Sequence, residues 1–379
     1  MSTEIPIGLA KNGRRAWALD DVNVVPTRRT RAPQDVDLSW QIDAFTFDAP
    51  VVAAPMDSVM SPATAIALGR LGGLGVLNLE GLWTRYENPE PVLDEIAALE
   101  AKEVSPENTR RLQELYSEPI KSELISARLA EIREAGVVVS GSLTPQRTQE
   151  FYRTVIDAGV DMFVIRGTTV SAEHVSTQTD PLNLKEFIYE LDVPVIVGGA
   201  AGYTPALHLM RTGAAGVLVG FGGSSASTTR RALGIRVPMA TAISDIAAAR
   251  RDYLDESGGR YVHVIADGGL GTSGDVVKAL GMGADAVMLG ATLARAEEAP
   301  GRGWHWGLEA VHQEFPRGHR TKVGTVAPLE ELLWGPGHHT DGTSNLMGGL
   351  RHAMAATGYV DLKSFQRVEA TVSPRAAEQ

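Results

Sequence analysis

The sequence has no cysteine among its 379 residues, and this absence excludes disulfides, thiolate metal ligands and covalent thiol chemistry. Basic residues are also scarce relative to acidic ones. The chain has 35 Lys and Arg against 46 Asp and Glu, so its formal net charge is −11. Sequence-independent binding of nucleic acid depends on basic surface, so we expect no nucleic-acid partner.

Long apolar runs are missing as well. No run in the sequence approaches the roughly 18 residues that cross a bilayer, and we expect no membrane partner. The first residues, MSTEIPIGLAKNGRRAW, contain no apolar segment of signal-peptide length. We therefore expect a cytoplasmic protein.

Short runs rich in β-branched residues alternate with helical patterns, which is typical of βα units and a parallel sheet. Several runs are continuously apolar, as expected for strands covered on both faces. The predicted strands are Pro50–Ala54, Leu74–Leu77, Val137–Ser140, Met162–Ile165, Val193–Val197, Gly216–Val219, Val262–Ala266 and Ala286–Leu289. Eight such units predict an α/β fold, a single (β/α)8 TIM barrel domain over residues 1–379, with an open doubly wound sheet as the alternative.

Two segments interrupt this rhythm. Residues 81–135 are too long for one crossover, and their charged, amphipathic pattern predicts two or three helices inserted between the second and third strands. Residues 297–345 are rich in Gly, His and Trp, and they predict a flap or lid before a final helix, Leu346–Thr357. Within this segment, the GWHWG stretch either closes over an aromatic ligand or fixes the flap to the barrel.

The strongest functional motif is ADGGLGTSGDVVKALGMGADAVMLGA, which spans the exits of the seventh and eighth predicted strands. Barrel enzymes often hold a phosphate there on backbone N–H groups at a helix N-terminus. Gly268, Gly269, Gly290 and Ala291 are the candidate phosphate contacts, and Asp267 can accept hydrogen bonds from a ribose diol. The alternatives are tight turns for the glycines, and an N-cap or ion pair for Asp267.

The loop GFGGSSASTTRR follows the sixth predicted strand, beside that motif. Its serines, including Ser225, offer hydroxyl groups to a phosphate. Its carbonyl groups could converge on a hard cation, and we place a candidate K+ loop at Gly222, Ser224 and Ser227. The alternative is a serine-rich turn that caps the next helix.

Two further candidates carry weaker signals. Met56, in APMDSV at the exit of the first predicted strand, could pack against a flat base, although methionine is more often a core residue. His338, His339 and Asp341 form the nearest approach to a metal-binding group. They lack a helical i, i+4 arrangement, and we predict no metal site.

In their order, these motifs resemble those of the IMP dehydrogenase/GMP reductase family. The resembling blocks are WALDDVNVVPTRRTRAPQDVDLSW, APMDSV, GGLGVLN, ADGGLGTSGDVVKALGMGADAVMLG and NLMGGLRHAM. They cover nearly the whole chain except about residues 80–135, where the full-length dehydrogenases carry a pair of CBS domains. The chain is thus most similar to the short, CBS-less IMP-dehydrogenase-related group of actinobacteria and cyanobacteria.

The resemblance implies a barrel that assembles as a tetramer or octamer and binds a purine nucleoside monophosphate such as IMP, XMP or GMP. It also implies NAD-dependent oxidation of IMP to XMP through a loop cysteine, as in GMP biosynthesis. By position, the resemblance assigns the base contact to Met56, the ribose contact to Asp267, and phosphate contacts to Ser225, Gly269 and Gly290. It also places Ser227 where the family has the cysteine and Thr229 where the family has its assisting threonine.

The departures from the family pattern lie at the positions of the nucleophile and of the cofactor contacts. Ser227 lacks thiolate character, and a serine nucleophile needs an adjacent base, which is not evident in the loop. On the cofactor side, in the stretch Arg166, Gly167 and Thr168, the arginine stands where the family has an aspartate. An arginine cannot accept hydrogen bonds from a nicotinamide ribose, and the alternative is an ion pair with a neighbouring carboxylate.

Two hypotheses follow, because the nucleotide-binding residues match the family pattern and the residues of the nucleophile and cofactor positions do not. The first is an IMP-dehydrogenase-related oxidoreductase that uses NAD. The second is a non-catalytic purine-nucleotide binder that acts as a sensor or partner subunit. Arg317 and Arg320 lie where the family has a water-activating arginine–tyrosine pair, but the tyrosine is missing. Because the departures spare the phosphate and ribose side, they favour binding over turnover.

Overall fold

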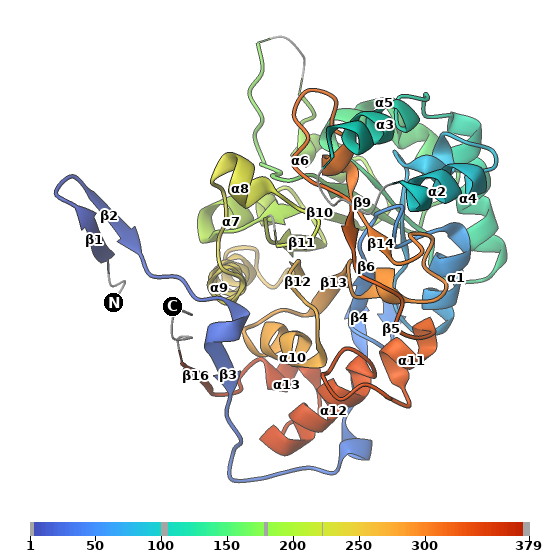
Figure 1. Ribbon diagram of the computed structural model, residues 1–379. Coiled ribbons are helices and arrows are strands. Elements are labelled where there is room, and N and C mark those ends of the chain that lie inside the picture. The colour runs from blue at the N-terminus through green and yellow to red at the C-terminus, as the bar shows by residue number, and fades with distance from the viewer. Residues whose placement is uncertain (1–3, 100–104, 178–180, 222, 374–379) are drawn as a thin grey trace.

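Eight parallel strands form the centre of the protein in a computed structural model that describes residues 4–99, 105–177, 181–221 and 223–373. Their order is β6-β13-β12-β11-β10-β9-β8-β7, and a parallel bridge between Val52 and Leu74 joins the two ends of the sheet. The strands are β6 (Val51–Ala53), β7 (Val76–Asn78), β8 (Ser140–Leu143), β9 (Met162–Arg166), β10 (Val195–Ala200), β11 (Gly216–Val219), β12 (His263–Asp267) and β13 (Ala286–Leu289). The sheet is a barrel (Figure 1), and the predicted (β/α)8 fold is confirmed.

Eight helices surround this barrel (Figure 1). They are α1 (Pro62–Arg70), α4 (Ser122–Glu134), α5 (Pro145–Asp157), α6 (Leu184–Tyr189), α7 (Tyr203–Arg211), α9 (Met239–Glu256), α10 (Ser273–Gly281) and α12 (Leu346–Thr357). Helix α12 has the bounds that the sequence predicted. None of the helices in the described ranges is long and apolar enough to span a membrane.

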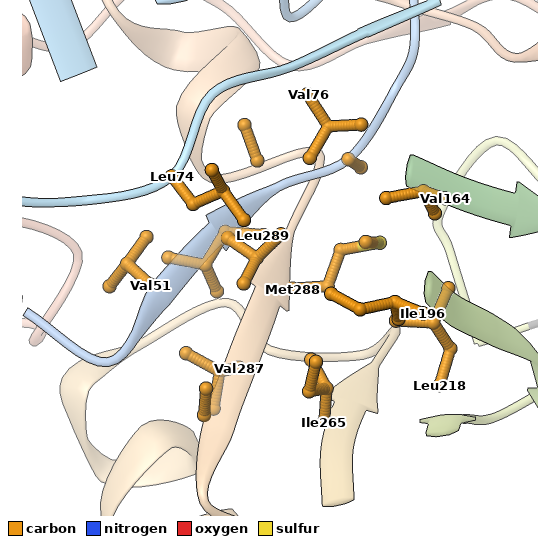
Figure 2. Packing of buried hydrophobic residues seen from close by; sticks show 14 of the residues in the cluster. Val51, Leu74, Val76, Val164, Ile196, Leu218, Ile265, Val287, Met288 and Leu289 are labelled. Carbon is orange, nitrogen blue, oxygen red and sulfur yellow. The ribbon is translucent and has the colours of Figure 1, made fainter. Parts of the chain in front are cut away.

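Aliphatic side chains fill the interior of the barrel and the layer between its strands and the surrounding helices. Figure 2 shows side chains from several of the strands packed together, among them Val164, Ile196, Leu218 and Ile265. All four are 0% exposed. A barrel strand is covered inside by other strands and outside by helices, so it needs apolar residues on both faces. Each such side chain stabilises the fold by about 1.5–3 kcal/mol relative to an exposed one.

Two predicted strands differ from the observed ones by up to three residues at an end, for local reasons. The third was predicted at residues 137–140, but the N–H of Val139 donates to Asp161 Oδ2 at 2.8 Å instead of to a neighbouring strand, and β8 begins one residue later. The fifth was predicted to end at Val197. It continues through Gly198, where an added Cβ would lie 2.5 Å from the Cβ of Leu218. The glycine allows close strand approach there and does not mark a turn.

The described residues of the long segment between β7 and β8 form three helices. They are α2 (Glu90–Ala98), α3 (Pro106–Leu115) and α4, after the short 3-10 helix η3 (Leu82–Thr84). The last helix, α4, packs between α1 and α5 and serves as the second outer helix of the barrel. Only the part that contains α2 and α3 is additional to the barrel, and α3 packs against the 3-10 helix η5 (Leu308–Val311).

The remaining elements lie at the periphery. A hairpin of β4 (Trp40–Ile42) and β5 (Phe45–Phe47) lies against the start of β12, where Trp40 Nε1 donates to His263 Nδ1 at 3.1 Å. A second hairpin projects away from the barrel (Figure 1). The other elements are β1 (Glu4–Gly8), β2 (Lys11–Arg14), β3 (Val22–Val24) paired with β16 (Ala370–Val372), α8 (Thr229–Leu233), β14 (Trp304–His305), β15 (Thr321–Lys322), α11 (Leu329–Trp334) and α13 (Leu362–Phe365), with the 3-10 helices η1 (Leu19–Asp21), η2 (Pro33–Asp35) and η4 (Leu293–Arg295).

Candidate functional site

A cavity of about 520 Å³ opens at the carboxyl end of the barrel strands. Active sites of barrel enzymes lie at this end, where the loops from several strands converge. The walls come from the segments after β6, β8, β9, β11 and β12, together with residues 307–318. The lining includes the predicted site residues Met56, Arg166, Gly167, Thr168, Ser224, Ser227, Asp267 and Gly268.

Glycines allow the loops after β11 and β12 to touch through their backbones. Gly220 has a φ of +144°, and a Cβ there would lie 2.1 Å from the carbonyl oxygen of Asp267. Gly268 has a φ of +110°, and a Cβ there would lie 3.2 Å from the Cα of Gly223. Larger residues would separate the loops, so this wall of the cavity depends on glycine backbone.

The helix after β12 begins close to this wall. Thr272 caps α10 by accepting a hydrogen bond from the N–H of Asp275 at 3.2 Å, and the Asp275 carboxylate accepts from the N–H of Thr272 at 3.0 Å. This reciprocal cap fixes the first turn of the helix. The N–H of Gly271 also donates to the Asp275 carboxylate, at 3.0 Å, so this side chain already binds two N–H groups at the start of the helix.

Arg166 and Asp267 form an ion pair across the cavity. The Nε and Nη2 atoms of Arg166 both donate to Asp267 Oδ2 at 3.1 Å. The two side chains are 29% and 13% exposed. The interpretation of Arg166 as the partner of a carboxylate is therefore confirmed, and that carboxylate is the predicted ribose ligand.

Sequence reasoning missed Glu309, which lies beside Ser227. Glu309 Oε2 lies 3.1 Å from the Ser227 hydroxyl and 3.2 Å from the Thr229 hydroxyl. Its other oxygen accepts a hydrogen bond from Thr168, which in turn accepts one from Arg317 Nη2 at 2.6 Å. A carboxylate in this position can accept a proton from Ser227 or from a water molecule beside it.

His305 connects the loop after β11 to the exit of β6. The side chain is 0% exposed; Nδ1 lies 3.1 Å from Ser58 Oγ and Nε2 lies 3.3 Å from Ser224 Oγ. Burial, aided by the positive charge of Arg166, lowers the pKa of His305 to about 4, so the ring is neutral at pH 7. Of the two interpretations of the GWHWG stretch, the structure supports attachment to the barrel, because His305 and Trp306 are both buried against protein.

The other predicted residues lie around the cavity without lining it. Ser225 is exposed, and Thr229 is buried behind Ser227. A Cβ on Gly290 would lie 3.5 Å from Met56 Sδ, which places that glycine behind the methionine. Gly269 follows the lining residue Gly268, and neither Gly269 nor Ala291 lines the cavity. Arg320 turns away from the cavity and stacks on Trp304, with 3.7 Å between its guanidinium carbon and the ring centroid.

The predicted K+ loop is only partly described. Gly222 lies outside the described residues. The Ser224 carbonyl accepts a hydrogen bond from the N–H of Ser227 at 3.1 Å, and the Ser224 hydroxyl faces His305. Within the part of the chain that the structure describes, no group of three or more His, Asp or Glu side chains is arranged to hold a metal ion.

Comparisons with known proteins agree with this geometry. Residues 16–307 match the IMP dehydrogenase / GMP reductase domain. An uncharacterized oxidoreductase of Mycolicibacterium smegmatis is 51% identical over 97% of this chain and 99% of its own length. The inosine-5'-monophosphate dehydrogenase of Methanocaldococcus jannaschii is 26% identical over 93% of this chain and 91% of its own length.

A solved structure shows the same fold. The crystal structure of an IMP dehydrogenase/GMP reductase-like protein from Corynebacterium glutamicum superposes with a TM-score of 0.93, at 50% identity over 98% of each chain. Since the domain match covers most of the sequence and relatives of about half identity cover nearly all of it, the chain belongs to the IMP dehydrogenase/GMP reductase family.

Proposed function

We propose that the protein binds a purine nucleoside monophosphate in the cavity and does not carry out the thiol-dependent oxidation of IMP. The base would lie against Met56 and the ribose would face Asp267, and the phosphate would extend beyond the lining residues to the backbone N–H groups after β12 and β13. The observation that carries this proposal is the intact glycine wall at Gly220 and Gly268 beside a serine at the position of the nucleophile.

The dimensions and chemistry of the cavity support a ligand of this class. Its volume of about 520 Å³ falls within the range of small-molecule sites, about 300–1,000 Å³. Met56 supplies an apolar surface, and Asp267 and Thr168 supply polar groups along the lining. The ribose, however, must share Asp267 with Arg166 or displace the arginine from it.

A second candidate function is turnover, and the position of Glu309 favours it. Ser227 and Thr229 both contact Glu309 Oε2, so a proton acceptor lies next to the serine. NAD+ would accept the hydride in such a reaction, with Arg166, Gly167 and Thr168 on the cofactor side. A serine hydroxyl remains a much weaker nucleophile than a thiol near neutral pH, which places this candidate second.

Thermal unfolding with IMP, XMP and GMP tests both candidates at once. A ligand present at 100 times its dissociation constant stabilises the folded state by about 2.7 kcal/mol. We expect at least one purine monophosphate to raise the midpoint, and adenosine without phosphate to have little effect. If none of the three nucleotides shifts the midpoint, both candidates are wrong.

Steady-state assays separate binding from turnover. They follow NAD+ reduction with IMP and NADPH oxidation with GMP, in the wild type and in Ser227→Cys. We expect no turnover in either protein, because Arg166 still occupies the cofactor side after the thiol is restored. Turnover by the wild type would establish the second candidate. Turnover by Ser227→Cys alone would mean that loss of the thiol is the single block.

A further inference from the structure

The segment from Arg302 to Arg320 brings Glu309 and Arg317 to the cavity, yet it has little regular structure of its own. It contains the two residues of β14 and the 3-10 helix η5. A segment of this kind needs contacts with a rigid neighbour to hold its side chains in place. Helices α2 and α3, which are additional to the barrel, supply such contacts.

Tyr116, at the end of α3, is the central contact. Its hydroxyl donates to Asp57 Oδ2 at 2.5 Å and accepts from Trp306 Nε1 at 2.8 Å. All three side chains are buried, at 2%, 6% and 1% exposure for Asp57, Tyr116 and Trp306. Tyr116 therefore joins the exit of β6, next to Met56, to the segment that carries Glu309.

Asp57 is itself fixed by the barrel. Its carboxylate also accepts from the N–H of Leu82 at 3.1 Å and from the Asn78 amide at 3.4 Å. Burial raises the pKa of Asp57 to about 6, partly offset by these hydrogen bonds. The hydroxyl of Tyr116 thus donates to the Asp57 carboxylate, which residues at the ends of the first two barrel strands hold in place.

Two other groups of contacts attach α2 and α3 to the same segment. The Gln113 side-chain amide donates to the carbonyl oxygen of His312 at 2.9 Å, and the Gln313 amide donates to the carbonyl oxygen of Gln113 at 3.0 Å. The Arg320 guanidinium donates to the carbonyl oxygen of Leu99, just beyond the end of α2, at 2.9 Å. Tyr116 and Arg320 are the buried side chains of this interface, at 6% and 2% exposure.

We infer that Tyr116 is a positioning residue: through Asp57 and Trp306 it connects helices α2 and α3 to residues 302–320 and so fixes Glu309 beside Ser227. The inserted helices would then be part of the machinery of the cavity, although none of their described residues lines it. Tyr116 would have this role in the protein without ligand, whichever nucleotide the cavity binds.

A single introduced thiol tests this role cleanly, because the chain has no cysteine of its own. Ala310 is 2% exposed and follows Glu309, so Ala310→Cys reports local opening of the segment to a thiol reagent. In this background, Tyr116→Phe should raise the labelling rate about tenfold or more, since it removes a buried hydrogen bond to a carboxylate.

Two controls separate positioning from general destabilisation. Tyr86→Phe removes a hydroxyl that donates to the carbonyl oxygen of Leu115 at 2.8 Å, near the same helix end, and it should leave the labelling of Ala310→Cys nearly unchanged. A second reporter, Ala206→Cys on α7, replaces a side chain that is 0% exposed and reports opening elsewhere in the barrel. Tyr116→Phe should not accelerate labelling of that reporter.

Two results would overturn the inference. One is a labelling rate of the Ala310→Cys reporter that Tyr116→Phe leaves unchanged. The other is an equal acceleration at the Ala206→Cys reporter, which would show that the hydroxyl stabilises the whole barrel. Because no nucleotide is present in the experiment, its outcome is independent of whether a purine monophosphate binds.

Discussion

The two sides of the cavity are built in different ways. The side formed by the loops after β11 and β12 is made of backbone, and glycines at Gly220 and Gly268 bring the loops into contact. The opposite side is made of side chains that bind side chains of these loops, with Arg166 on Asp267 and Glu309 on Ser227. A backbone wall is ready to receive an anion, whereas paired side chains must exchange partners before they contact a ligand.

The largest expected effect comes from breaking the backbone wall. Gly220→Ala should lower the free energy of unfolding by about 3 kcal/mol, since the new Cβ meets the carbonyl of Asp267 and a positive φ is unfavourable for alanine. Nucleotide binding should be lost with it. Chemical denaturation measures the first effect and calorimetric titration the second.

Gly234→Ala is the matched control for that substitution. This glycine also has a positive φ, +71°, but no atom lies within 4 Å of an added Cβ. The cost should be about 1 kcal/mol, from backbone strain alone. Equal costs at the two positions would contradict the view that close contact between the loops shapes this side.

The second effect concerns His305, which lies between the two sides. Its pKa is held at about 4, below the 6.5 of an ordinary histidine, so the unfolded chain binds a proton more readily than the folded one across this interval. This contribution to stability is therefore present above pH 6.5 and is lost as the pH falls toward 4. It amounts to about 2 kcal/mol between pH 7 and pH 5.

His305→Gln should remove that part of the pH dependence, as measured by denaturation at pH 7 and pH 5. His352→Gln, at an exposed position on α12, is the control and should leave the dependence unchanged. Asp57 acts in the opposite direction, because its raised pKa favours the folded state as the pH falls through 6. Comparing each variant with the wild type removes that contribution, and an identical pH dependence in His305→Gln and wild type would contradict the assignment.

The third expected effect is a change in nucleotide affinity when the ion pair of the paired side is broken. Arg166→Gln releases Asp267, so affinity for a purine monophosphate should rise about tenfold, the equivalent of one hydrogen bond from a ribose hydroxyl to a charged group. The free energy of unfolding should change by less than about 1 kcal/mol, as for other partly exposed ion pairs. Arg211→Gln, which breaks the exposed pair with Glu256, should leave affinity unchanged. Weaker binding in Arg166→Gln would mean that the arginine contacts the ligand itself.

The backbone side was also the side that the sequence predicted best. Strand runs, glycine exits and the stretch from Asp267 to Gly269 are local signals, and they identified the barrel and the loops that border its cavity. The errors were local too: Val139 donates to a side chain instead of a strand, and Gly198 continues a strand that was predicted to end before it.

On the paired side, the sequence suggested a carboxylate partner for Arg166, but the contacts of Glu309 and Tyr116 could not be predicted because they join distant parts of the chain. Glu309 reaches Ser227 across 82 residues, and Tyr116 reaches Trp306 across 190. No spacing or motif distinguishes Glu309 from Glu314 in the same segment. In the folded chain α3 packs against residues 308–311, and the N–H of His319 donates to the carbonyl oxygen of Ala226 at 2.9 Å, so the segment that contains Glu309 lies against the loop of Ser227.

A calorimetric titration of the wild type with IMP, followed by addition of NAD+ to the same complex, measures binding and oxidation on one sample. We expect saturable binding at one site per chain and no NADH absorbance after NAD+ is added. Absence of binding would contradict the proposed ligand. Binding followed by steady formation of NADH would contradict the view that the side with Arg166 and Ser227 no longer supports the oxidation.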